Sequence, residues 1–77
     1  MAIKKEQVHG YWVLFEEEFR NGINYLENDL QVAEAKTIFS AAKLNGSAEF
    51  EDDMDRDWTL LYNKNDFTYT LVKRNRE

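Results

Sequence analysis

The sequence predicts one small domain of the α+β class, with N-terminal helical segments packed on a C-terminal three-stranded antiparallel β-meander. Three observations predict this class. An alanine-rich run over residues 30–44 has helical spacing, three later segments are rich in aromatic and β-branched residues, and the chain has 77 residues, too few for a second core. The expected element order over residues 1–77 is α-α-β-β-β.

The N-terminal third, residues 8–30, can be interpreted in two ways. Apolar side chains recur at intervals of three and four residues, as along one helix face: Val8, Trp12, Phe15, Phe19, Ile23, Leu26 and Leu30. The alternative is an N-terminal hairpin that turns at Asn21-Gly22, a strong hairpin dipeptide, and it gives the order ββαβββ. That hairpin would place Glu17 and Glu18 among apolar partners, which is costly. The helical interpretation is therefore favoured.

The helix over residues 30–44 has clear signals at both ends. Asn28 or Asp29 can cap its start, and Asn45-Gly46 supplies a left-handed stop. The meander follows, with strands expected at 48–51, 58–62 and 67–73 and a turn at 63–66. Alternation then places two sets of side chains on the faces that cover the helix: Trp58, Leu60 and Tyr62 on one strand, and Phe67, Tyr69 and Leu71 on the next.

Charge is distributed unevenly along the chain. Residues 6–72 carry 14 acidic and five basic side chains, a net charge of −9, whereas the whole chain has a net charge of −5. The remaining net charge of +4 comes from Lys4, Lys5, Lys73, Arg74 and Arg76 against Glu77. The short basic ends at about 1–5 and 74–77 are expected to be flexible. Nonspecific nucleic-acid binding needs clustered lysine and arginine, so direct binding of nucleic acid is not expected.

The cellular compartment follows from composition. The chain has no cysteine, and none of its apolar runs is long enough to cross a bilayer. A small secreted domain would usually need disulfides, so we expect a cytoplasmic protein with no membrane contact.

The most acidic segment is 49–57, where six of nine side chains are carboxylates. Such a block stays hydrated and sets the electrostatic field that a partner meets. These residues form the predicted acidic patch for partner binding, and three consecutive glutamates form a second part of it: Glu49, Glu51, Asp52, Asp53, Asp55 and Asp57, with Glu16, Glu17 and Glu18.

Metal binding is a weaker expectation in the same segment. Asp53, Asp55 and Asp57 have the D-x-D-x-D spacing that opens an EF-hand calcium loop. The loop's glycine is replaced by Trp58 and its final glutamate by Lys64, so a solvated turn is the preferred interpretation. We expect no metal centre and no cofactor.

The sequence offers no assembled catalytic group. His9 is the only histidine, and Ser40 and Ser47 lie outside any nucleophile motif. We therefore expect a protein that is not an enzyme.

The leading functional hypothesis is a small acidic protein–protein interaction module. It would be an inhibitor, immunity protein or antitoxin whose clustered carboxylates engage a basic, nucleic-acid-binding surface of another protein. One alternative is a homodimeric structural or adaptor domain, in which the residues that fall off the main helical stripe meet a second copy: Tyr11, Val13, Leu14 and Tyr25. A further alternative is a small metal- or metabolite-responsive regulatory module.

Overall fold

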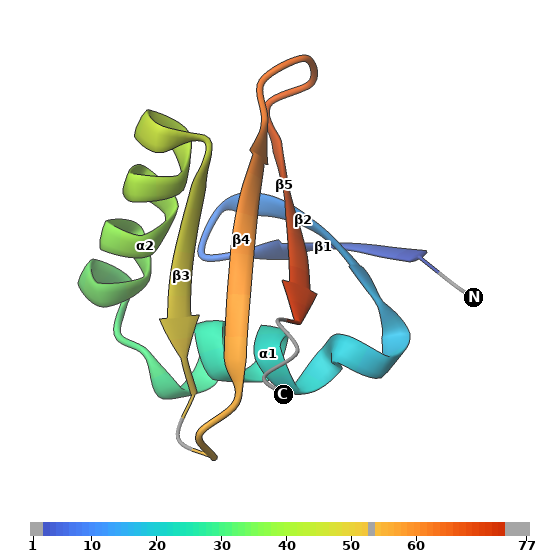
Figure 1. The fold of residues 1–77 in the computed structure, drawn as a ribbon, viewed down its shortest axis with the longest axis vertical. Coiled ribbons are helices and arrows are strands. Elements are labelled where there is room, and N and C mark those ends of the chain that lie inside the picture. Colours follow the sequence, from blue (N-terminus) through green and yellow to red (C-terminus); the bar gives the residue numbers. More distant parts are fainter. Residues whose placement is uncertain (1–2, 53, 74–77) are drawn as a thin grey trace.

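The structure is a computed structural model that describes residues 3–52 and 54–73. Two strands precede the helical segments and three follow them (Figure 1). The elements are β1 (Ile3–Val8), β2 (Tyr11–Glu16), the 3₁₀ turn η1 (Glu17–Phe19), α1 (Arg20–Asn24), the π-helical turn η2 (Tyr25–Asp29), α2 (Val32–Asn45), β3 (Ser47–Glu51), β4 (Asp57–Asn63) and β5 (Thr68–Lys73).

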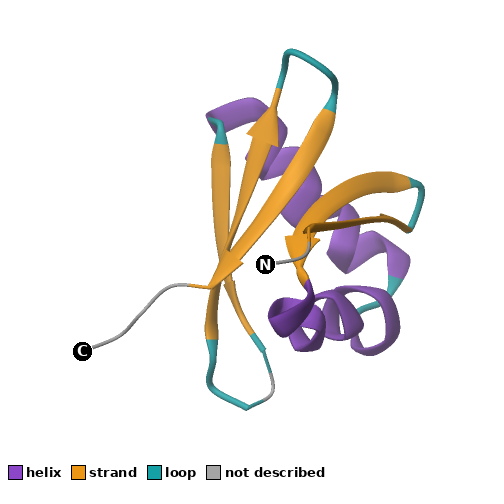
Figure 2. Cartoon of the chain, turned by 90° about the vertical axis from the view of Figure 1, so that its right-hand side faces the viewer, coloured by secondary structure: helices purple, strands orange, loops and turns teal. Residues whose placement is uncertain are grey.

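All five strands form one mixed sheet in the order β1-β2-β5-β4-β3. Neighbours are antiparallel except β2 and β5, which run parallel. The sheet is strongly twisted, and the helices lie on one of its faces while the opposite face carries none (Figure 2). The N-terminal hairpin and the C-terminal meander are thus joined edge to edge through β5.

The predicted N-terminal helix and three-stranded sheet are therefore wrong. Residues 3–16 form a hairpin closed by His9 and Gly10, whose φ angles of 52° and 89° are typical of a two-residue type I′ turn. Tyr11, Val13 and Phe15 face the core from β2 at period two. The helical stripe was misleading because residues 11–15 are all apolar, so that Tyr11, Val13 and Phe15 satisfy strand alternation as well as Trp12 and Phe15 satisfy helical spacing.

The alternative hairpin at Asn21-Gly22 is also wrong, because both residues lie in α1. Gly22 serves close packing instead of a turn. A Cβ placed there would lie 2.8 Å from Leu71 Cδ2 and 2.9 Å from Trp58 Cδ2, so only glycine lets this helix approach the sheet so closely.

Helix α2 begins two residues later than predicted, with Gln31 as its N-cap in place of Asn28 or Asp29. The backbone N–H of Gln31 donates to Glu34 Oε1 at 3.1 Å, one half of a capping box. Gly46, with φ of 93°, ends the helix, and its N–H donates to the carbonyl of Ala42.

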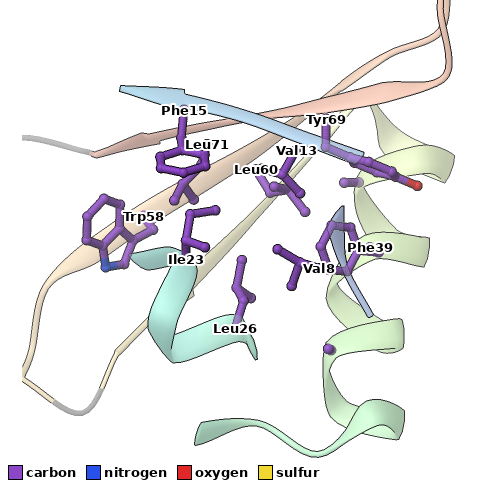
Figure 3. Packing of buried hydrophobic residues seen from close by; sticks show 12 residues of the cluster. Val8, Val13, Phe15, Ile23, Leu26, Phe39, Trp58, Leu60, Tyr69 and Leu71 are labelled. Atoms are coloured by element: carbon purple, nitrogen blue, oxygen red, sulfur yellow. The ribbon is translucent and has the colours of Figure 1, made fainter. Parts of the chain in front are cut away.

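The core lies between the sheet and its helices (Figure 3). Tyr11 stacks on Phe39 with ring centroids 4.2 Å apart, which joins β2 to α2. The buried apolar side chains come from β1, β2, α1, η2, α2, β4 and β5: Val8, Val13, Phe15, Ile23, Leu26, Ala35, Phe39, Ala42, Trp58, Leu60, Tyr69 and Leu71.

Phe67 does not join the core, contrary to the predicted strand face. It lies in the β4–β5 turn with φ of 61° and is 74% exposed. Lys4 and Lys5, predicted to lie in a basic flexible end, belong to strand β1, and the predicted end at 74–77 lies outside the described residues. Among the described residues, each helix is too short or too polar to cross a membrane.

Candidate functional site

We call the helix-free side of the sheet the open face. Cross-strand partners share a face, so its membership follows from the register. One row crosses all five strands, from Lys5 through Leu14, Thr70 and Leu61 to Ser47. The open face comprises Ile3, Lys5, Gln7, Trp12, Leu14, Glu16, Ser47, Glu49, Glu51, Asp57, Thr59, Leu61, Asn63, Thr68, Thr70 and Val72.

Strand β3 brings two predicted carboxylates onto the open face. Ala48 and Phe50 face the core, so Glu49 and Glu51 point the other way and are exposed. Glu51 pairs directly with Asp57 at the start of β4, which brings a third carboxylate beside them, although Asp57 is buried with 8% of its surface exposed. Three of the predicted patch residues are therefore neighbours on two adjacent strands.

Glu16, the last residue of β2, lies on the same face. It is partly buried, and its Oε1 has no hydrogen-bond partner among the described residues. A buried acceptor without a donor is costly, so this oxygen favours a state in which a donor reaches it. The fold thus places Glu16 on the same face as Glu49, Glu51 and Asp57, with strand β5 between Glu16 and the other three.

Asp52 does not belong to the acidic surface, which corrects the prediction. Its side chain is fully buried and accepts four hydrogen bonds, from the backbone N–H groups of Met54 and Arg56 at 2.9 and 3.0 Å, Arg56 Nε at 2.8 Å and Trp58 Nε1 at 3.0 Å. Burial acts to raise the pKa of Asp52, but the Trp58 indole, the Arg56 and Met54 N–H groups and the Arg56 guanidinium outweigh it and lower the pKa to about 2.

The remaining acids of the segment lie in the β3–β4 turn. Asp55 is exposed with φ of 62°, and Asp53 lies outside the described residues. The conjectured D-x-D-x-D metal site includes Asp53 and so lies partly outside the described residues. Within residues 3–52 and 54–73, Asp57 is on the sheet beside Glu51, and no group of three potential ligands that could hold a metal is found.

Glu17 and Glu18 leave the predicted patch because β2 ends at Glu16 and the chain turns into η1. Arg20 bridges Glu17 at 3.0 Å and Glu6 of β1 at 2.8 Å. The hydrogen bond from Arg20 lowers the pKa of Glu17. Glu17 thus links η1 to the start of α1, whereas the neighbouring Glu18 is exposed.

The four residues predicted to form a dimer contact do not share a surface. Val13 is fully buried, and Tyr11 packs between Phe39 and Tyr69. Tyr25 stacks on Phe50 with centroids 6.0 Å apart, on the helix side of the sheet. Only Leu14 lies on the open face, so this proposed dimer surface is wrong.

Sequence reasoning missed the apolar part of the open face. Trp12 is 45% exposed, with Lys5 Nζ 5.2 Å from its ring centroid, and Leu61 is 37% exposed. The available signal was alternation: Trp12 and Leu14 sit between the core residues of β2, so a strand there requires them to face outward.

His9 has a structural position at the tip of the N-terminal hairpin. Its Nε2 lies 2.8 Å from the carbonyl oxygen of Leu26 and donates to it, which ties the tip to the π-helical turn. Ser40 and Ser47 are on α2 and at the start of β3, and both are exposed.

Comparison of the chain with protein-family models, curated proteins and solved structures finds no match. The open face must therefore be interpreted from its own chemistry. It combines two exposed carboxylates, Glu49 and Glu51, and the more buried Glu16 and Asp57 with an exposed indole and aliphatic side chains.

Proposed function

We propose that this protein is a non-catalytic binding module that engages a basic surface of another protein through the open face of its sheet. The observation that carries the proposal is that Glu16, Glu49, Glu51 and Asp57 share the helix-free face, although they come from three strands. Partners that fit are proteins with a groove for DNA or RNA, so the module would act as an inhibitor, immunity protein or antitoxin.

The spacing of these carboxylates supports the choice of partner. Strands lie about 4.8 Å apart, and residues i and i+2 on one strand are separated by about 6.7 Å. Carboxylates on this lattice present repeated negative charge to the cations that would otherwise bind phosphates. Complementary charge speeds association and fixes orientation more than it adds affinity.

Affinity would come from the apolar part of the face. Interface energy concentrates in buried aromatic and aliphatic anchors, and the exposed indole of Trp12 and the side chain of Leu61 supply such groups on the same face as the carboxylates. The proposal includes a cytoplasmic location, because a chain without cysteine suits a reducing compartment.

The test is affinity capture with two charge-matched variants. The double variant Glu49→Gln/Glu51→Gln removes the two exposed carboxylates of the open face, and Glu18→Gln/Glu27→Gln removes the same charge from exposed residues elsewhere. We expect the wild type and the control to retain one basic protein that about 0.5 M salt releases, because the screening length falls to about 4 Å. The open-face variant should lose at least tenfold in affinity for that protein.

A second measurement addresses the mechanism. The captured protein should bind a DNA or RNA probe in a gel-shift assay, and the wild-type module should displace that probe at low salt. Equal capture by both double variants, or a captured protein whose probe binding the module leaves unchanged, would contradict the proposal.

A further inference from the structure

Strand β1 offers a free edge of the sheet. It is six residues long, pairs with β2 without a bulge from Ile3–Glu16 to Val8–Tyr11, and packs mainly on that strand. The other edge strand, β3, differs because α2 packs along it. A regular edge strand that is paired on one side only carries unpaired N–H and C=O groups on the other side, and it can pair there with another strand.

The register shows which backbone groups of β1 face this edge. A hairpin closed by two residues has a hydrogen-bonded flanking pair, here Val8 and Tyr11. Alternate residues of β1 therefore bond to β2, namely Val8, Glu6 and Lys4. The N–H and C=O groups of Ile3, Lys5 and Gln7 consequently point away from β2.

We propose that two copies of this chain pair through antiparallel β1 strands, which merges their sheets into one of ten strands. The proposal does not rest on the acidic open face or on its partner. It follows from the free edge and from the charge pattern of the strand itself.

In such a dimer, residues whose N–H and C=O groups point to the free edge must pair with residues of the same kind in the second copy, because only they can form the new backbone hydrogen bonds. The register centred on Lys5 pairs the largest number of them, with Ile3 opposite Gln7 of the second copy. It also sets Lys4 of each copy opposite Glu6 of the other. These two pairs are non-hydrogen-bonded positions with Cα atoms about 4.5 Å apart, where opposite charges attract most strongly.

Two features of the described structure suit this register. Glu6 is half-exposed even with Arg20 on its Oε2, so its carboxylate can accept a second cation. The two Lys5 residues would meet at the two-fold axis, but each ammonium lies over the Trp12 ring of its own β2 strand, away from the free edge. Charged residues that usually protect an edge are here complementary to a second copy.

The first experiment is sedimentation equilibrium of the full chain from about 1 to 500 µM, which should show a monomer–dimer equilibrium. Lys5→Pro removes the outward N–H but keeps the hydrogen bonds to β2. Lys5→Thr is its matched control, since it loses the same charge and retains the N–H. Lys5→Pro should raise the dimer Kd at least tenfold relative to Lys5→Thr, with unchanged far-UV circular dichroism.

The second experiment tests the register. Lys4→Glu and Glu6→Lys each place like charges opposite one another twice, so each should raise Kd about tenfold. The double variant restores opposite charges and should return Kd to within about threefold of wild type. A chain that stays monomeric at all concentrations, a Kd that Lys5→Pro leaves equal to that of Lys5→Thr, or a double variant no tighter than the singles would overturn the proposal.

Discussion

Asp52 organises the β3–β4 connection at the level of a single residue. Its two carboxylate oxygens accept from Met54, Arg56 and Trp58, so one side chain fixes the turn backbone, holds a guanidinium and satisfies a buried indole N–H. The sequence placed it in a block of surface charges. The carboxylate is instead part of the packed interior, because Trp58 beside it must bury both its ring and its polar nitrogen.

We predict that Asp52→Asn lowers the free energy of unfolding by about 2 kcal/mol at pH 7, because an amide cannot accept from donors on both sides. The folded pKa of about 2 lies below the ordinary value of 3.8, so the ionised carboxylate stabilises the fold above pH 4. That contribution is lost as the pH falls from about 4 to 2. Urea denaturation at pH 7, 5 and 3 should show that the difference in free energy of unfolding between wild type and variant becomes smaller as the pH falls.

The control for this prediction is Asp55→Asn, an exposed residue of the same turn. It should change stability by less than about 0.5 kcal/mol at each pH. A gap that stays constant down to pH 3, or an Asp52→Asn protein as stable as wild type, would show that the buried carboxylate does not stabilise the turn.

At the scale of elements, the short α1 helix is held against the sheet by close approach. Gly22 lies on the Trp58 ring and beside Leu71, so the helix axis can come nearer than any residue with a Cβ would allow. The neighbouring Ile23 and Leu26 then reach the core from one side of the same helical segment. The absence of a Cβ at Gly22 thus sets the distance between α1 and the sheet.

We predict that Gly22→Ala destabilises the fold by about 1–2 kcal/mol, although alanine favours a helix by about 1 kcal/mol over glycine. The added Cβ would fall within 3 Å of side-chain carbons of Leu71 and Trp58, which must shift. Asn24→Ala, at an exposed position of the same helix, gains the propensity without the clash and should be neutral or slightly stabilising. Thermal unfolding of both variants measures the difference, and a stabilised Gly22→Ala would contradict this account.

Sequence patterns were informative where one periodicity stood alone. The alanine-rich run and the alternating aromatic segments lie where α2, β3, β4 and β5 are found, because length and turn residues separated helix from strand there. The N-terminal third allowed both periods, and its turn, His9-Gly10, is not a usual type I′ dipeptide. The open face was unpredictable without β2, because it exists only once Leu14 pairs with Thr70.

For the whole molecule, the parallel β2–β5 pair joins the two ends of the chain. The hairpin of residues 3–16 contributes only two strands, and it joins the rest of the sheet through β5, which lies between β2 and β4. Two strands alone are marginal in water, so the hairpin is not expected to remain ordered without β5 beside it. The core also joins the hairpin to the C-terminal strands, since Val13 and Phe15 share one buried cluster with Tyr69 and Leu71 from the far end of the sequence.

We predict that the protein unfolds in one cooperative step. In Trp12→Phe, which removes an exposed indole, Trp58 is the only tryptophan and reports on the C-terminal strands. Its fluorescence and the far-UV circular dichroism of the whole chain should give the same urea midpoint. Two separated midpoints would mean that the N-terminal hairpin and the meander unfold independently.

The central position of β5 also has a consequence for biosynthesis. The ribosome delivers this strand after the other four, yet it occupies the middle of the sheet, so β2 is made early and must wait for its neighbour β5. During translation β2 therefore keeps unpaired backbone groups on the side that later meets β5, and this edge can mispair until β5 inserts.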